Sequence, residues 1–371
     1  MTRPCYVFGD LMHEVATFSI VACDLKAHAW GVAVASKFPA VGAVVPWARA
    51  GAGAVATQAL ANTSYGPRGL EMMAGGLSAE ETIKKLVTRD KEREQRQVGL
   101  VDAHGSAASF TGKECMEWCG GLAGAGYAIQ GNLLTGIEVV QQMEHTFLDA
   151  HGELPERLFA ALEAGSRAGG DRRGRQSAAL YVAKQDGGYG GYNDRWIDLR
   201  VDDHIHPIPR LGELLELQRL YFGKSPKSGR VKLQGEAVRD IQTIMKSLGY
   251  YTSVDGLYDD ATREAFRVFI HNENFEDRAD PDAGWLDEPV LAIFGEADPG
   301  CPAEKIERLR QLLTGSALNH EIMVYPEAGR DFFDDSRASF NADAAEDAWK
   351  RALAFLDQHL DVPPRRSEHP M

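Results

Sequence analysis

Apolar and polar residues alternate in two short runs near the start of the chain. Thr17 to Cys23 and Trp30 to Ser36 follow the two-residue period of a strand with one buried face, and Asp24 to His28 between them has the composition of a turn. This pattern predicts a β-hairpin. Small residues from Ala54 to Gln58 then predict a third strand, along which another backbone or a ligand can approach closely.

Helical and strand-like patterns succeed one another as far as residue 223. Helices are expected after Gly66, over Thr82 to Val87 behind a capping box at Ser78, and over Ile137 to His151, Pro155 to Ala164 and Leu211 to Tyr221. Further strands are expected at Val98 to Asp102, Ala107 to Thr111, Gly126 to Gln130, Ser177 to Ala183 and Arg195 to Val201. Strand pairs that alternate with helices favour an α+β domain, a four-layer α/β/β/α sandwich of two stacked antiparallel sheets with helices outside both. The order of elements alone also fits other α+β folds.

The pattern changes after a basic linker rich in Lys, Ser and Gly. Helical periodicity over Glu236 to Leu248 and from about Asp260 to Asn272 predicts a small helical domain. Strands at Pro289 to Phe294 and His320 to Tyr325, which alternate with helices at Pro302 to Leu313 and Ala342 to Leu360, then predict a C-terminal α/β fragment. The expected parts of the chain are an extension at 1–16, a first domain at 17–223, a linker at 224–234, the helical domain at 235–286 and the fragment at 287–371.

Composition and charge narrow the classes of function. The chain has 371 residues, 44% of them hydrophobic and 25% charged, which is typical of a globular protein with more than one domain. Its net charge of −14 argues against binding to nucleic acid or to anionic membranes, both of which require a basic surface. Residues 1–16 lack the pattern of a signal peptide, so a cytoplasmic protein is expected.

Cysteine and histidine spacings give no firm indication of a metal or redox centre. Five scattered cysteines disfavour a disulfide framework, and Cys115 and Cys119 are spaced more widely than a CxxC pair. The run from Asp202 to His206 has metal-ligating side chains, but such tight spacing after a strand is more typical of a surface turn. No metal and no cofactor is therefore expected.

Several long motifs in order resemble the bacterial family called domain of unknown function 1028. They are Thr17 to Ala22, Val32 to Gly42, Trp47 to Gly51, Ala54 to Gln58, Gln130 to Asn132, Gly169 to Ser177 and Gly190 to Arg195. That family is similar in fold to the proteasome-like N-terminal-nucleophile hydrolases, which agrees with the sandwich expected from the pattern. The resemblance implies that Thr17 is the nucleophile, because a threonine with a free α-amine carries its own general base. Here residues 1–16 precede it, so processing, a misassigned start or a lost activity are the three explanations to weigh.

Other residues in these motifs are candidates for a site around Thr17. An N-terminal nucleophile needs a nearby cation and dipoles that stabilise the oxyanion. Arg49 is the candidate cation, Ser36 the partner of the Thr17 amine, and Gln58 or Asn132 the group that faces the oxyanion. A sheet hydrogen bond for Ser36 and a surface ion pair for Arg49 are equally good interpretations.

Substrate-binding candidates lie in three further loops. Gln130 belongs to a polar–glycine–polar turn after a strand, Asp171 and Arg172 to a Gly- and Arg-rich loop that is either a solvated loop or an anion clamp, and Asn193 to a Gly-rich turn. The expected ligand is a small molecule, either an amide or an anionic metabolite. A homodimer is compatible with the acidic surface and the appended helical module.

The rest of the chain resembles two other families. Residues 235–286 are similar to peptidoglycan-binding-like helical domains, for which a packing or dimerisation role is expected here. Residues from 287 resemble the C-terminal part of dienelactone hydrolases, with Asp298 at the position of the triad acid but Arg330 at that of the histidine. Arginine stays protonated and cannot act as a general base, so this fragment is expected to be inactive as a triad.

Three hypotheses of function follow. The first is an amide hydrolase with Thr17 as N-terminal nucleophile once the extension is removed. The second is a non-catalytic protein that binds an anionic small molecule near Arg172 or acts as a scaffold. The third, an esterase in the C-terminal segment, is disfavoured by Arg330.

Overall fold

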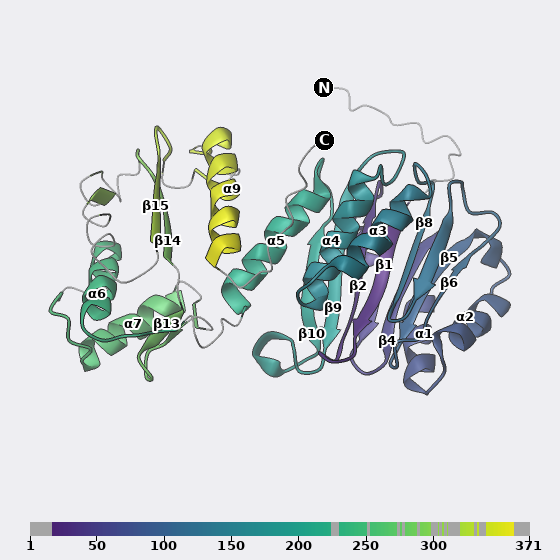
Figure 1. Ribbon diagram of the computed structural model, residues 1–371, viewed down its shortest axis with the longest axis horizontal. Coiled ribbons are helices and arrows are strands. Elements are labelled where there is room, and N and C mark those ends of the chain that lie inside the picture. The colour runs from purple at the N-terminus through teal and green to yellow at the C-terminus, as the bar shows by residue number, and fades with distance from the viewer. Residues whose placement is uncertain are drawn as a thin grey trace, which may run out of the picture. The chain divides into compact units, whose positions relative to one another are not determined.

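The computed structural model describes residues 17–223, 230–250, 253–272, 275–276, 279–287, 290–297, 303, 306–307, 310, 320–329, 332–333 and 339–359 (Figure 1). The chain divides between Leu215 and Glu216 into two compact units, each of which is described by itself.

An antiparallel sheet of six strands is the centre of the first unit. Its strands are β1 (Thr17–Asp24), β2 (Ala29–Ser36), β7 (Gly120–Gly124), β8 (Tyr127–Asn132), β9 (Ser177–Lys184) and β10 (Arg195–Val201). They lie in the order β10-β9-β2-β1-β8-β7, so β1 is an inner strand between β2 and β8. The hairpin expected from the first two alternating runs is β1–β2, whose register pairs Thr17 with Ser36 and Asp24 with Ala29.

A second antiparallel sheet has four strands in the order β3-β4-β5-β6. These are β3 (Pro46–Arg49), β4 (Gly53–Ala59), β5 (Arg96–Asp102) and β6 (Ala107–Thr111). Two helices follow β4 in sequence, α1 (Tyr65–Ala74) and α2 (Ala79–Thr88), and α2 begins at the expected capping box, in which Ser78 and Glu81 bond each other's backbone amides.

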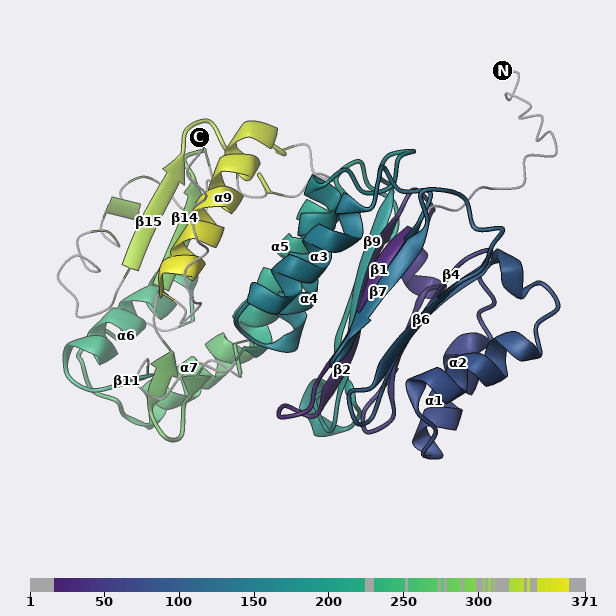
Figure 2. The ribbon, with the colours of Figure 1, turned by 45° about the vertical axis from the view of Figure 1, so that its right-hand side comes forward.

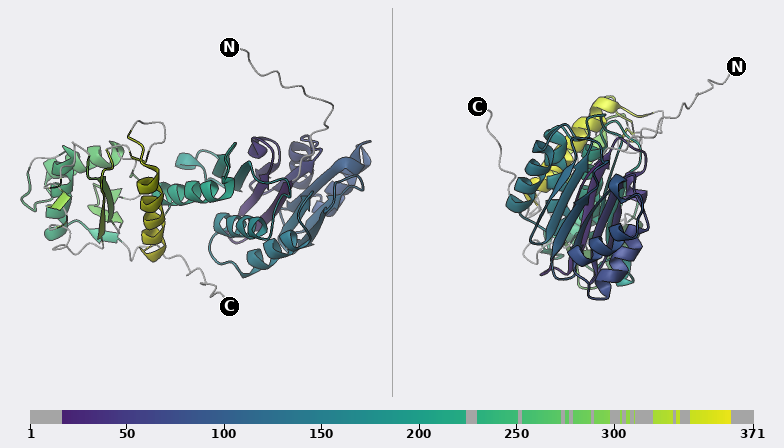
Figure 3. Two further views of the ribbon diagram at one scale, coloured as in Figure 1. Left: turned by 90° about the horizontal axis from the view of Figure 1, so that it is seen from above. Right: turned by 90° about the vertical axis from the view of Figure 1, so that its right-hand side faces the viewer.

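Alternation along the strands determines what each sheet face contacts. Ile20 of β1 packs among the helices α3 (Glu138–Asp149), α4 (Leu154–Arg167) and the start of α5 (Pro207–Phe222), whereas Val21 packs with Ala54 of the second sheet. Val55 of β4 faces the opposite way and packs with Leu86 of α2. Figures 2 and 3 show the result: the sheets face each other, with α3 and α4 outside one and α1 and α2 outside the other.

The expected α+β class is confirmed as a mixed architecture of sheets and helices, and all the strands expected before residue 202 are present. Two further strands, β3 and β7, are not predicted by the hydrophobic pattern. Both are short edge strands: the side chains of β3 are half-buried or exposed without alternation, and β7 is mostly glycine. Neither therefore has the period-two signal on which strand prediction depends.

The second unit has two clusters of elements. One contains α6 (Glu236–Leu248), α7 (Asp260–Asn272) and a small sheet of β11 (Arg230–Lys232), β13 (Trp285–Asp287) and β12 (Ala279–Asp280). The other pairs β14 (Val290–Gly295) in parallel with β15 (His320–Tyr325), next to α9 (Ala342–His359). The helix expected at Pro302 to Leu313 lies largely outside the described residues. Among the helices that the structure describes, none has the length and apolar character needed to cross a membrane.

Candidate functional site

Thr17 is the first residue of β1 and is fully buried at one end of the six-stranded sheet. It pairs with Ser36 at the end of β2 and with Asn132 at the end of β8. Its side chain faces the second sheet, because Val21 on the same face of β1 does so, and Thr17 Oγ1 donates a 3.1 Å hydrogen bond to Ser36 Oγ. The structure thus brings the candidate nucleophile Thr17 together with Ser36, one of its expected helpers.

Gln58 reaches Thr17 from the second sheet. Its Nε2 donates to the Thr17 carbonyl oxygen at 3.1 Å and to Gln97 Oε1 at 2.8 Å, while its Oε1 accepts a 2.6 Å bond from Ser19 Oγ. Both hydrogens of the Gln58 amide nitrogen are therefore engaged within the protein. The role of Gln58 in this arrangement is to fix the backbone of Thr17.

Gln97 is the residue of the site that the sequence analysis missed. It lies at the start of β5, is fully buried, and accepts hydrogen bonds from both Gln58 and Asn132, the latter at 2.9 Å. Its own Nε2 donates to Thr111 Oγ1 at 2.9 Å and to the Gly131 carbonyl at 2.8 Å. A glutamine in the inward-facing register of an otherwise apolar strand is the signal that could have identified it, but only if the partner strands were known.

Gln130 lies in the same layer as Thr17. Its Nε2 donates a 2.6 Å bond to Ser19 Oγ, while its Oε1 is buried without a hydrogen-bond partner among the described residues. The amide fits only because β5 has a glycine opposite it: a Cβ on Gly99 would lie 1.9 Å from Gln130 Oε1. Gln130 therefore acts through the packing between the sheets, and it is not among the residues that line the two cavities described below.

Two expected residues are not brought to Thr17. Arg49 pairs with Gly53 at the far end of β4 from Gln58, five residues or about 17 Å along the strand, and donates to the Leu70 carbonyl at 2.8 Å. Asn193 lies in the β9–β10 turn, at the opposite end of β9 from Ser177, and its side chain accepts from the Arg195 amide at 2.8 Å. The sequence could not separate the two ends of the sheets, because both ends carry Gly-rich turns.

The Gly- and Arg-rich loop after α4 closes the same end of the six-stranded sheet. Asp171 is almost fully buried, and its carboxylate accepts from the Lys37 amide at 2.7 Å and pairs with the Arg173 guanidinium at 2.9 Å. The Arg172 amide donates to the Leu133 carbonyl at 3.2 Å. Asp171 is thus a structural anchor of this loop together with Arg173, whereas Arg172 and Arg175 line a cavity.

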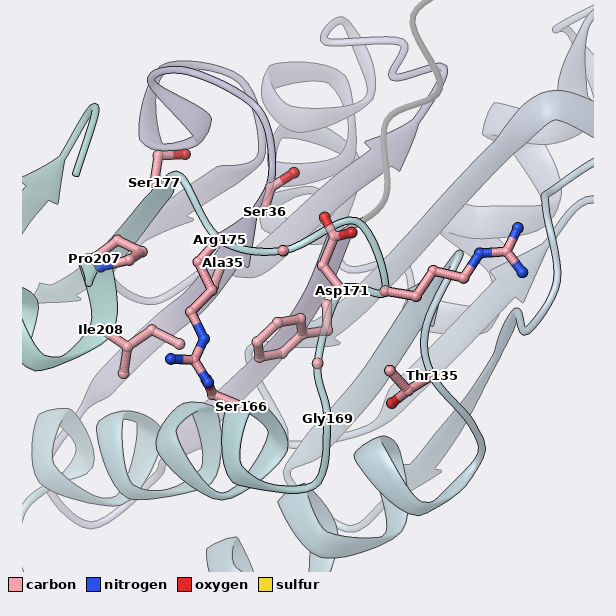
Figure 4. A pocket seen from close by; sticks show the side chains of 14 residues that line it. Ala35, Ser36, Thr135, Ser166, Gly169, Asp171, Arg175, Ser177, Pro207 and Ile208 are labelled. Carbon is pink, nitrogen blue, oxygen red and sulfur yellow. The ribbon is translucent and has the colours of Figure 1, made fainter. Parts of the chain in front are cut away.

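This loop borders a cavity of about 230 Å³ on the helix side of the sheet. Arg172, Arg175, Phe18 and Ile208 are among its lining residues. In Figure 4, Arg175 extends across the cavity toward Ser166 at the end of α4, between Ile208 and the Gly169 turn, while the side chains of Ser36 and Ser177 point away from it.

A second cavity has a volume of about 440 Å³ and lies at the end of the two sheets where Thr17 is found. Thr17, the candidate nucleophile, and Gln58 are among its lining residues. The backbone around it is strained: Ala59, directly after Gln58, has φ 66°, and Leu133, directly after Asn132, has φ 53°. Non-glycine residues seldom adopt such angles, and they cluster at functional sites.

A cluster of polar side chains around Asp90 fixes the position of Arg96, which lines this cavity. Asp90 accepts hydrogen bonds from Asn62 at 3.0 Å, Tyr65 at 2.9 Å and Arg96 at 3.1 Å. Burial opposes ionisation of Asp90, but these bonds and one from the Glu92 amide outweigh it and hold the pKa of Asp90 well below its ordinary value. Arg96 also donates to the Leu60 carbonyl and pairs with Glu92. The sequence analysis did not single out these residues.

Comparison with known proteins identifies relatives of both halves of the chain. The model of the “Family of unknown function (DUF1028)” matches residues 17–211. A crystal structure of a Silicibacter pomeroyi protein described under DUF1028 is 32% identical, with a TM-score of 0.51, and the match covers 55% of this chain and 86% of that chain.

The models of a “Putative peptidoglycan binding domain” and of the “Dienelactone hydrolase family” match residues 221–294 and 260–360. Proteins named “Putative carboxymethylenebutenolidase” are similar to the same C-terminal region: the Yersinia pestis protein is 46% identical over 71 residues, 19% of this chain and 27% of its own length. The Escherichia coli (strain K12) protein is 40% identical over 74 residues, 20% of this chain and 27% of its own length. The chain thus spans about a quarter of the length of these curated relatives.

Proposed function

The chain belongs to the family of unknown function DUF1028, whose model its residues 17–211 match, and from this premise we propose that it hydrolyses amide C–N bonds with Thr17 as an N-terminal nucleophile. The proposal includes the four-layer α/β/β/α arrangement of the N-terminal-nucleophile hydrolases for the first unit. The observation that carries it is that Thr17 begins an inner strand and lines the cavity between the sheets.

The proposed reaction starts once residues 1–16 are removed. The α-amine of Thr17 accepts the Oγ1 proton as Oγ1 attacks the substrate carbonyl, and the collapse of the tetrahedral intermediate transfers that proton to the departing amine. A water molecule then adds to the acyl ester, and Thr17 Oγ1 leaves with a proton while the acid is released. Ser36, which accepts the Thr17 hydroxyl bond in the described state, orients the hydroxyl before the attack.

Asn132 and Gln58 differ in how many hydrogens of their side-chain amide nitrogens remain available to a substrate. Gln58 uses both hydrogens of its amide nitrogen on Thr17 and Gln97. Among the described residues, Asn132 Nδ2 bonds to Gln97 alone, and so has a second hydrogen to offer to an oxyanion. We assign Asn132 to the oxyanion and Gln58 to positioning; Arg49 has no part in this scheme.

The test compares N-termini and turnover. The full chain is purified, its N-terminus is determined by intact mass, and a panel of N-acyl anilides is assayed with it and with a chain that begins at Thr17. Hydrolysis is expected only when Thr17 is N-terminal and is expected to fall by at least about a hundredfold in Thr17→Ala. Thr88→Ala, on the exposed face of α2, is the matched control. An active protein that still begins at Met1, or a chain beginning at Thr17 that turns over nothing, would sink the proposal.

A second candidate function is supported by the arginine loop. The side chains of Arg172 and Arg175 are exposed at the 230 Å³ cavity, and neither guanidinium pairs with a carboxylate among the described residues, whereas Arg173 between them pairs with Asp171. A cavity of 150 Å³ is large enough for benzene, so this one has room for an aromatic or aliphatic carboxylate. Phenylacetate should bind the unprocessed chain in calorimetry and should bind more weakly to Arg175→Gln, with Arg195→Gln as the control for charge. Equal binding to both variants would remove this alternative.

The esterase hypothesis depends on Asp298 as the triad acid and is disfavoured by Arg330 at the histidine position. Both residues lie outside the described part of the chain. Its basis is the likeness to a quarter of the length of the carboxymethylenebutenolidase-named relatives. Rapid hydrolysis of p-nitrophenyl acetate that is lost in Asp298→Ala would establish it.

A further inference from the structure

The cavity that Thr17 shares with Gln58 has an apolar interior. Its apolar lining residues include Leu60, after β4, and four residues from the segment after β2, namely Phe38, Val41, Val44 and Val45. Val41 and Val45 are buried, while Phe38, Val44 and Leu60 are half-buried. An uncharged group placed here would be removed from water by side chains that offer it no hydrogen bond.

The charged residues that line this cavity, Arg96 and Glu92, pair with each other. The Arg96 side chain is only 11% exposed and is held by Asp90, Glu92 and the Leu60 carbonyl. Glu92 in turn pairs with Arg96. A carboxylate on the substrate would therefore lose its hydration in this cavity and meet no unpaired cation among the described lining residues, which is unfavourable.

The size of the cavity limits the group that it can take. Its volume of about 440 Å³ falls within the usual range of small-molecule pockets and is nearly three times the 150 Å³ known to hold benzene. An acetyl group would leave most of this space unfilled. An acyl chain of about four to eight carbons would use it.

We propose that this cavity binds the acyl side of the substrate and selects uncharged, apolar acyl groups of medium length. The inference rests on the proposed function for the identity of the reacting bond, because the acyl group is the part of the substrate that becomes bonded to Thr17 Oγ1, and Thr17 lines this cavity. The substrate class is thus an N-acyl amide of an aliphatic acid, and charge is tolerated only on the amine side.

Binding of unreacted amides tests this specificity independently of turnover. Thr17→Ala is prepared as the full chain and as the chain that lacks residues 1–16, and both are titrated with acetamide, hexanamide and adipamic acid by calorimetry. Each buried methylene is worth roughly fourfold in affinity, so hexanamide, which has four methylenes more than acetamide, should bind about two hundredfold more tightly. Adipamic acid, which adds a terminal carboxylate, should bind at least about tenfold more weakly than hexanamide.

Variants connect the preference to this cavity. Val44→Asp should abolish the preference for hexanamide, and Leu60→Ser should reduce it while disturbing the fold less. Val87→Asp, at a half-buried position of α2 outside the cavity, should leave the preference intact.

Each result decides one question. If neither form of Thr17→Ala prefers hexanamide over acetamide, or if adipamic acid binds as tightly as hexanamide, the inference is wrong. If the preference holds but the chain that begins at Thr17 hydrolyses no amide, the cavity assignment stands and the proposed catalysis fails.

Discussion

At the scale of single residues, the site is built from side chains that look ordinary in the sequence. Thr17, Gln58 and Gln97 are buried polar residues in mostly apolar strands, and hydrogen bonds link Gln58 to both of the others. Burial of such a group without its partner costs free energy, so the network is fixed as a unit.

Gly99 tests that packing directly. Gly99→Ala should lower the free energy of unfolding by about 1–3 kcal/mol, because the new Cβ would overlap Gln130 Oε1 at 1.9 Å. The measurement is urea unfolding of Gly99→Ala, Gln130→Ala and the double variant. In the Gln130→Ala background the same substitution should cost little. Equal costs in both backgrounds would contradict this explanation.

The two buried thiols, Cys23 and Cys115, should be unreactive in the folded state. Burial, followed by the charge of Asp102, raises the pKa of Cys23 to about 11, and burial, followed by the proximity of Cys119, raises the pKa of Cys115 to about 11. Near neutral pH this leaves about a hundredfold less thiolate than an ordinary cysteine has. Iodoacetamide labelling read by mass spectrometry should therefore modify both much more slowly in the native than in the urea-unfolded protein. Labelling of native Cys115 at the unfolded rate would contradict the burial of this thiol.

At the scale of elements, the two antiparallel sheets bring strand ends together. β1 and β5 begin at this end of the unit while β2, β4 and β8 finish there, so that the polar ends of five strands from separate parts of the sequence meet. The sequence predicted the strands and four of these polar residues, Thr17, Ser36, Gln58 and Asn132. It could not give the register, on which their proximity depends.

Asp90 connects three elements, and its contribution to the stability of the fold depends on pH. Its bonds reach the segment after β4, the start of α1 and the start of β5 through Asn62, Tyr65 and Arg96. Because the pKa of Asp90 is lower in the folded than in the unfolded chain, its stabilisation is complete above about pH 5 and is lost as the pH falls through the unfolded value near 3.9 toward the folded one.

Asp90→Asn should therefore be less stable than the parent at pH 6, and this difference should shrink at pH 3.5. Unfolding by urea at the two pH values measures it. Asp149→Asn, whose side chain is 72% exposed, is the control and should show little change at either pH. A deficit of the same size at both pH values would show that Asp90 acts by packing and not by its charge.

At the scale of the whole molecule, a family domain is joined to a C-terminal region related to other proteins. The DUF1028 model ends at residue 211, and the dienelactone hydrolase model covers residues 260–360. The linker at 224–234, the helical domain boundaries, the cytoplasmic location and the homodimer stay predictions of the sequence.

Limited proteolysis tests the linker. Trypsin should cleave first after Lys224 or Lys227, because the linker composition favours an extended, accessible chain, and should leave a fragment that ends there. Lys184, whose ammonium lies 4.2 Å from the centre of the Trp196 ring, should be cleaved later. A first cut within residues 17–223 would contradict this boundary. Mass spectrometry of samples taken during the digest identifies the order in which these sites are cleaved.

The sequence by itself determined most of the strands and helices of the first unit, though not the edge strands β3 and β7. It also determined the motifs of the DUF1028 family and the candidacy of Thr17, because these depend on local periodicity and on residue identity. The tertiary structure alone decided which polar residues meet. Antiparallel register brings Gln58, Gln97 and Asn132 to Thr17 but leaves Arg49 at the far end of β4 and Asn193 at the far end of β9. A strand has two ends with similar turn residues, and hydrogen bonding between strands distant in sequence determines which end becomes the site.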